Sequence, residues 1–366
     1  MSGQRDIAIV IPARNEAARI EACLTPLLAQ MPERLKLHVV VNNSEDSTAA
    51  RAERLCRDAA VPARISNLTL GPREGVGTAR RIGAAQALAE MPGLRYILTT
   101  DADCIVAQDW IARNLHHLER SAAVCGNIAP LTGEAAALTA RGAGDTPDRT
   151  QEHYGPDDLD IEGATLEKRY RALVLAFYRR HAPEPANPLP HHGQAPGASL
   201  AFCASAYQSI GGFAPLQCGE DRDIVRRLKG AGFHVAHAND VRVQASLRLS
   251  GRAPGGMSDT LRRRLSQQRY RIDSALPPPS WLWHRRDRLP HWPPEGRDYE
   301  PLHLDSLPEH IAHLEALLHP ETPHAWPIRA AARPASRRKD NGIQELPSFE
   351  PDPVPPDVTD TLTSIP

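Results

Sequence analysis

Between residues 7 and 128 the chain alternates short apolar runs with longer stretches of helical length. The apolar runs, which have the length and composition of strands, are residues 7–11, 37–41, 63–68, 96–100 and 122–128. The stretches between them that have the length of helices are residues 17–30, 47–60 and 77–90. This alternation is typical of a mostly parallel sheet flanked by helices, so we expect an α/β fold.

Composition and charge narrow the class of protein. The 366 residues carry a net charge of −1, so the chain lacks the excess of positive charge that is typical of general nucleic-acid-binding proteins. The six cysteines form no Cys-X-X-Cys pattern, so we expect reduced thiols in a cytoplasmic protein. No run approaches the roughly 18 to 20 apolar residues of a membrane span, and the N-terminus does not resemble a signal peptide. We expect no membrane span, while peripheral contact with a membrane stays open.

The pattern of the chain changes twice after the alternating region. Residues 132–196 are polar and rich in loop residues around one amphipathic helix at 164–181, and we interpret them as an insertion that shapes a second-substrate pocket. Strand and helix patterns then resume at 197–202, 220–231, 232–243 and 257–273. We therefore predict a main domain at 1–273, a Trp/Pro-rich extension at 274–320 and a Pro-rich tail at 321–366, whose composition is typical of disorder.

Two carboxylates end the fourth apolar run. Asp101 and Asp103 follow residues 96–100 directly, which places them at the carboxyl end of a predicted strand. Open α/β sheets bind their ligands at this end. Two hard oxygen ligands suit a divalent cation, Mn²⁺ or Mg²⁺, that is also held by substrate phosphates. The pair therefore predicts a metal-bridged nucleoside diphosphate, although Asp also commonly ends a strand at a turn.

Four further patches occur in a fixed order around this pair. They are Pro12-Ala13-Arg14-Asn15-Glu16, Asn42-Asn43-Ser44-Glu45-Asp46, Gly75 to Arg81, and Gly211-Gly212-Phe213 followed by Glu220-Asp221. Together with Asp101-Ala102-Asp103 they resemble the family 2 glycosyltransferases with the GT-A fold over about residues 5–255. Asn42 stands where the family usually has an acid, and Gln244-Ala245-Ser246 lacks the histidine that completes the metal shell in related enzymes.

The resemblance implies a transferase that moves a sugar from a nucleotide-diphosphate donor to an unidentified acceptor, with inversion. It implies a metal held by Asp103 and oriented with Asp101, and a general base at Asp221 supported by Glu220; the roles of these two acids could be exchanged. Guanidinium groups suit phosphate, and Arg248 and Arg252 lie in a loop whose composition is that of a mobile lid. The expected donor-binding residues are Pro12, Arg14, Asn15, Glu16, Asn42, Asp46, Arg80, Arg81, Asp101 and Arg252.

Other interpretations stay open at this point. Glu220 and Asp221 could simply cap a helix, and one of Arg80 and Arg81 could be a solvated helix residue. A sugar-phosphate nucleotidyltransferase could carry the same sheet and acids, but the Gly-rich triphosphate loop of that class is replaced here by Pro12 to Glu16. A non-catalytic nucleotide-sugar-binding module would be expected to lack Asp103 or Asp221, and both are present.

Overall fold

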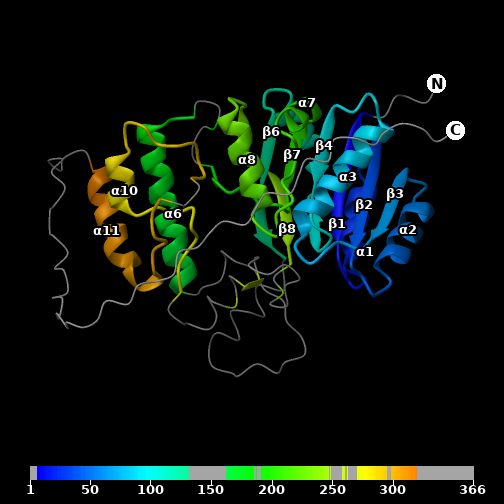
Figure 1. The fold of residues 1–366 in the computed structure, drawn as a ribbon, viewed down its shortest axis with the longest axis horizontal. Helices are drawn as coiled ribbons and strands as arrows, with labels where there is room; N and C mark the ends of the chain where they lie inside the picture. Colours follow the sequence, from blue (N-terminus) through cyan, green and yellow to red (C-terminus); the bar gives the residue numbers. More distant parts are fainter. Residues whose placement is uncertain are drawn as a thin grey trace, which may run out of the picture. The chain divides into compact units, whose positions relative to one another are not determined.

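A central eight-stranded sheet organises the protein (Figure 1). The computed structural model describes residues 6–131, 162–184, 187, 191–246, 248, 258–259, 262, 270–294 and 298–319. The strand order is β3-β2-β1-β4-β7-β6-β8-β5. The strands are β1 (Ile7–Ala13), β2 (Leu35–Asn42), β3 (Ala63–Leu68), β4 (Tyr96–Thr99), β5 (Cys104–Val106), β6 (Ala123–Pro130), β7 (Leu200–Cys203) and β8 (Val235–Ala245).

Parallel pairing dominates the N-terminal half of the sheet. Strands β3, β2, β1 and β4 pair in parallel, and β6 pairs in parallel with β8. Strand β7 is antiparallel to both β4 and β6, and β5 is antiparallel to β8. The carboxyl ends of β1, β2 and β4 therefore lie at one edge of the sheet, which is the arrangement that the sequence predicted.

Helices bury both faces of the sheet. Because successive side chains of a strand point to opposite faces, Ile9 and Ile11 of β1 lie in one core cluster while Val10 lies in another. The helices that pack on the two faces are α1 (Ile20–Leu28), α2 (Thr48–Asp58) and α4 (Trp110–Leu118) on the first, and α3 (Val76–Glu90), α7 (Ala204–Ser209) and α8 (Glu220–Gly230) on the second. This architecture confirms the predicted α/β fold.

A second core lies beyond the sheet. Helix α6 (Glu162–His181) packs against α11 (Leu307–Leu318), and α10 (Pro279–His284) contacts α11 (green, orange and yellow in Figure 1). Tyr170 and Phe177 of α6 are fully buried in one cluster with Leu282 and Leu307. The helix of the predicted insertion and the Trp/Pro-rich extension thus share a core, although about 100 residues separate them in the sequence.

Several elements differ from those predicted. The sequence pattern missed β5 and α4, and α1 begins at Ile20, three residues after the predicted start. The predicted helix at 257–273 is wrong at its end, because residues 270–273 are not helical and Arg271 forms an isolated bridge with His303. Most of the remainder of that segment, most of the insertion and the tail at 321–366 lie outside the described residues. No helix in the described part of the chain is long and apolar enough to cross a membrane.

Candidate active site

The turns after β1 and β2 are joined by hydrogen bonds. The backbone N–H of Asn15 donates to Ser44 Oγ over 2.9 Å, and the N–H of Glu45 donates to Asn15 Oδ1 over 2.9 Å. Asn15 has a φ of 53°, a left-handed conformation that Asn tolerates better than most residues. Asn15 therefore fixes the shape of the first turn against the second.

Asp46 contributes to the same junction from the start of α2. Its Oδ2 accepts the N–H of Ala17 at 2.9 Å, and its Oδ1 accepts the N–H of Thr48 at 3.0 Å and the Thr48 hydroxyl. The Thr48 hydroxyl oxygen in turn accepts the N–H of Glu16 at 2.7 Å. Asp46 thus accepts the N–H of the first residue of α2 and, through the Thr48 hydroxyl, holds Glu16 in place.

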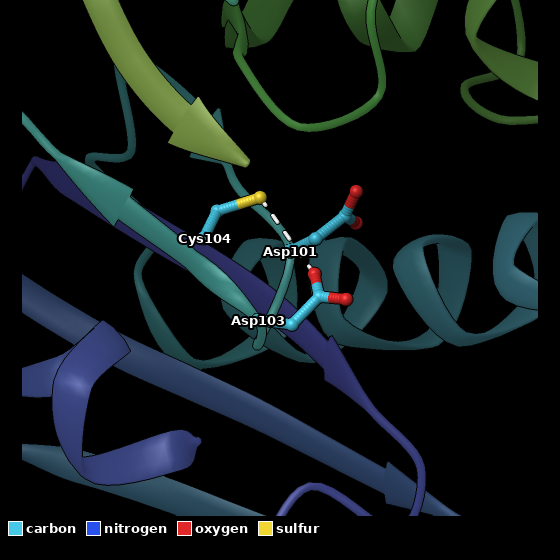
Figure 2. Close-up of side chains that lie close together, drawn as sticks. All are labelled: Asp101, Asp103 and Cys104. Atoms are coloured by element: carbon cyan, nitrogen blue, oxygen red, sulfur yellow. Dashed lines mark hydrogen bonds between the residues drawn. The ribbon is translucent and has the colours of Figure 1, made fainter. Parts of the chain in front are cut away.

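Asp101 and Asp103 lie in the turn between β4 and β5. Figure 2 shows both carboxylates on the same side of this turn, with the thiol of Cys104 beside them. One ligand atom from each of the three residues lies within 4.8 Å of the others. Asp101 is 35% exposed and Asp103 is 18% exposed, so the pair can be reached by a ligand.

The thiol of Cys104 is a softer ligand than Mg²⁺ and Mn²⁺ prefer. Burial, followed by the charges of Asp103 and Asp101, raises the pKa of this thiol well above its usual range. It donates a weak hydrogen bond to Asp103 Oδ1 over 3.7 Å. The two carboxylates remain as oxygen ligands of the kind that Mg²⁺ and Mn²⁺ prefer.

Arg248 joins Asp103 to the turn after β1. Its guanidinium binds both carboxylate oxygens of Glu16, at 2.5 and 2.8 Å, and lies 2.8 Å from Asp103 Oδ2. Burial raises the pKa of Asp103 to about 6; Arg248 opposes this shift, and Glu16 and Asp101 add to it. This crowding of carboxylates is the electrostatic setting that a bound cation relieves.

Arg80 of α3 connects the Asp101 turn with α8. The side chain is only 2% exposed, and its two terminal nitrogens form ion pairs with Glu220 and Asp101. The nitrogen that binds Asp101 also donates to the carbonyl of Gly197 over 2.9 Å. A buried guanidinium therefore connects Asp101 with the acid pair at the start of α8.

Helix α8 begins with the predicted acid pair. Glu220 is buried, and burial raises its pKa to about 7 against the opposing charge of Arg80. Asp221 is half-buried, and its Oδ2 accepts the N–H of Gly197 at 2.9 Å. Its Oδ1 accepts the N–H of Arg222 at 2.8 Å. The carboxylate of Asp221 is thus held at the N-terminus of α8 by two backbone N–H groups.

The structure brings most of the predicted site residues to one region. Pro12 and Asn42 are buried at the ends of β1 and β2, whereas Arg14 is exposed. Arg81 is also exposed, and it donates to the carbonyl of Phe213 over 3.2 Å. Arg252 lies outside the described residues.

The sequence did not predict Gly197 as a site residue. Gly197 contacts both Arg80 and Asp221 through its backbone, whereas the sequence pattern indicated only that a strand begins there. Its partners lie 117 and 24 residues away along the chain, so no local pattern marks it.

Comparison with known sequences identifies relatives of this architecture. Residues 8–149 match the model of the family described as Glycosyl transferase family 2. Glycosyltransferase AglE of Haloferax volcanii is 22% identical over 237 residues, which are 64% of this chain and 65% of that protein. The chain thus spans slightly less than two thirds of the length of this curated relative.

Solved structures are similar to this chain at lower sequence identity than AglE, and the two described here have TM-scores below 0.5. The mannosyltransferase PcManGT of Pyrobaculum calidifontis, in complex with GDP-Man and Mn²⁺, is 18% identical with a TM-score of 0.47, over 86% of this chain and 70% of that one. TarS 1–349 of S. aureus in complex with UDP-GlcNAc is 13% identical with a TM-score of 0.42, over 73% and 62% of the two chains.

Proposed function

We propose that the protein transfers a sugar from a nucleotide-diphosphate donor to an acceptor nucleophile, because residues 8–149 match the model of glycosyltransferase family 2. One observation carries the proposal. The donor-side acids Asp101 and Asp103 and the acid pair Glu220-Asp221 lie about 120 residues apart in the sequence, and Arg80 brings them together at one edge of the sheet. This arrangement supplies a metal-binding pair and a separate carboxylate for proton transfer.

Asp103 and Asp101 are the residues that would hold a divalent cation. The fit rests on two oxygen donors, on the raised pKa of Asp103 and on the neighbouring carboxylate of Glu16. A bound Mn²⁺ or Mg²⁺ would act as a Lewis acid that stabilises negative charge on the leaving diphosphate. Arg248, which lies between Glu16 and Asp103, supplies fixed positive charge in the same region.

Asp221 is the proposed general base. Transfer with inversion requires a group that removes the acceptor's proton on the side opposite the leaving group. The carboxylate of Asp221 is half-buried and is oriented by the backbone N–H groups of Gly197 and Arg222. Glu220 is held by Arg80 in the buried layer below, which suits a supporting role.

The nucleoside part of the donor would bind where β1, β2 and β4 end. Ligands of open α/β sheets bind outside these carboxyl ends. The turns that carry Glu16, Asn42 and Asp101 are fixed to one another or to the sheet by the contacts described above, so they offer a preformed surface. Asn15 and Asp46 would act by holding this surface in shape, and Pro12 and Arg14 would lie beside it.

A binding screen tests the proposal. Nucleotide sugars, with UDP-GlcNAc and GDP-Man first, would be added with Mn²⁺ and followed by thermal unfolding. A donor at one hundred times its Kd should raise the free energy of unfolding by about 2.7 kcal/mol. EDTA should remove most of this gain. A panel in which no nucleotide sugar and no nucleoside diphosphate stabilises the protein would contradict the proposal.

A further inference from the structure

We propose that Arg80 is a positioning residue for the transfer step: it fixes the base Asp221 relative to the donor-side carboxylate of Asp101 and does not bind the donor phosphates. The inference rests on the proposed function, which assigns Asp101 to the donor and Asp221 to proton transfer. It assigns Arg80 a role different from the phosphate contact that its position after a glycine-rich loop indicates.

The burial of Arg80 argues against contact with phosphate. Its side chain is 2% exposed, and one terminal nitrogen is paired with Glu220 while the other is paired with Asp101 and the Gly197 carbonyl. Turning toward a ligand would leave the carboxylate of Glu220, which is 4% exposed, buried without its partner. Such an uncompensated buried charge is strongly unfavourable, so the guanidinium stays where it is.

Two connections lead from Arg80 to Asp221. The first runs through Glu220, the neighbouring residue at the start of α8. The second runs through the peptide of Gly197, whose carbonyl accepts from Arg80 and whose N–H donates to Asp221 Oδ2 over 2.9 Å. A planar guanidinium fork holds its partners in one geometry, so displacing it shifts both supports of the base at once.

Gly197 shows how closely this arrangement is packed. A Cβ atom at this position would lie 2.9 Å from Nη1 and 2.8 Å from Nη2 of Arg80. A side chain there would therefore press on the guanidinium. Gly197→Ala is thus a second way to displace Arg80 while keeping every charged group of the cluster.

The test compares Arg80→Lys and Gly197→Ala with a structural control, Arg227→Lys. Like Arg80, Arg227 binds both carboxylate and backbone carbonyl groups: the carboxylate of Asp223 and the carbonyls of Ile210 and Gly212. It lies outside the active-site cluster. Two quantities would be measured: the Kd for UDP and GDP with Mn²⁺ by calorimetry, and kcat and KM for release of nucleoside diphosphate from UDP-GlcNAc or GDP-Man.

The expected result is a loss of kcat without a loss of affinity. A displaced base should lower kcat of Arg80→Lys and Gly197→Ala by roughly 10²-fold, the cost of a misplacement of about 1 Å. Their Kd for nucleoside diphosphate should change by less than about threefold, because neither substitution removes a group that contacts the nucleoside diphosphate. Arg227→Lys should lower the melting temperature and leave kcat unchanged.

Other outcomes would overturn the inference. A Kd raised about tenfold or more at unchanged kcat would make Arg80 a phosphate ligand. A lower melting temperature with unchanged kcat and Kd in both site variants would make it a structural ion pair. If Arg80→Lys does not fold, Gly197→Ala decides alone. A wild-type protein that neither binds UDP or GDP nor turns over a nucleotide sugar would refute the proposed function itself.

Discussion

Asp103 lies where its own charge is disfavoured. It is half-buried beside Glu16 and Asp101, and desolvation together with these two charges raises its pKa to about 6 despite the nearby Arg248. A carboxylate kept in such a place at the end of a strand contributes little to packing. Its location is instead explained by a cation that the residue would share with the donor.

Substitution of Asp103 tests this explanation. We expect Asp103→Asn to abolish Mn²⁺-dependent binding of nucleoside diphosphate and to leave the melting temperature within a few degrees, because the amide keeps the shape but not the charge of the ligand. Calorimetry with and without Mn²⁺ measures the effect. Cys104→Ser is the matched control: a thiol is a softer ligand than Mn²⁺ prefers, so binding should persist. The reverse pattern would assign the metal to the thiol.

Asp46 shows what a single residue's pattern can and cannot reveal. The sequence predicted it as a donor contact. In the structure its carboxylate accepts the N–H of Thr48 at the start of α2 and the N–H of Ala17 in the turn after β1. A contact with the donor stays a prediction. The bond to Ala17 depends on two turns that meet only in the folded sheet, so no sequence pattern indicated it.

At the scale of elements, periodic segments were predicted well. Strand β3 and helix α8 agree with their predicted bounds to within one residue. In α8 the apolar residues Ile224, Val225 and Leu228 recur at helical spacing. Strand β5 was missed because it has three residues and depends on pairing with β8, about 140 residues later in the chain. Short strands of this kind are specified by their partners rather than by their own sequence.

Strand β2 carries a residue that makes stability depend on pH. His38 is fully buried, and neither ring nitrogen has a hydrogen-bond partner among the described residues. Burial lowers its pKa to about 4 from the ordinary 6.5. Between these values the unfolded chain binds a proton that the folded protein does not, so stability falls as the pH falls from 6.5 toward 4.

We expect His38→Leu to remove this dependence. The wild-type free energy of unfolding should fall by up to about 1.4 kcal/mol per pH unit in that window because of His38 alone. Urea unfolding at several pH values measures how the free energy of unfolding depends on pH. His116→Leu, at an exposed histidine, serves as the control. An unchanged slope in His38→Leu would show that other groups cause the acid sensitivity.

Helix α3 approaches the sheet through a glycine. A Cβ atom on Gly83 would collide with Val10 of β1 and would lie 3.0 Å from Val40 of β2. Gly83→Ala should therefore destabilise the protein by roughly 1–3 kcal/mol, the usual cost of overpacking. Gly230→Ala on α8, where no atom lies within 4 Å of the added carbon, should be neutral or slightly stabilising. Equal melting temperatures of the two variants would contradict the close approach of α3.

At the scale of the whole molecule, distant segments complete the structure. Helix α6 obtains its buried partners from residues after 270, and Trp292 donates its indole N–H to the carbonyl of Gly193. The sequence showed that these segments contain apolar and aromatic residues, but not that they pack together. Their contacts join residues roughly a hundred positions apart, and no local pattern records such pairings.

Truncation separates the second core from the tail. A compact unit ends at Thr322, and residues after it are rich in proline and poor in apolar side chains. Removing residues 323–366 should leave the melting temperature and donor binding nearly unchanged. Removal from Leu307 onward should unfold at least the second core, because Leu307, Ile311 and Leu314 are buried in it. A fall of more than a few degrees after the shorter truncation would show that the tail contributes to folding.

The claim that this protein transfers sugars with Asp221 as the base is tested most directly by Asp221→Asn. The amide keeps the size of the side chain and can still accept the Gly197 N–H, but it cannot take a proton from the acceptor. We predict that kcat for release of nucleoside diphosphate falls by roughly 10²- to 10⁴-fold while the Kd of the donor is preserved. A folded Asp221→Asn variant with wild-type kcat would contradict the account.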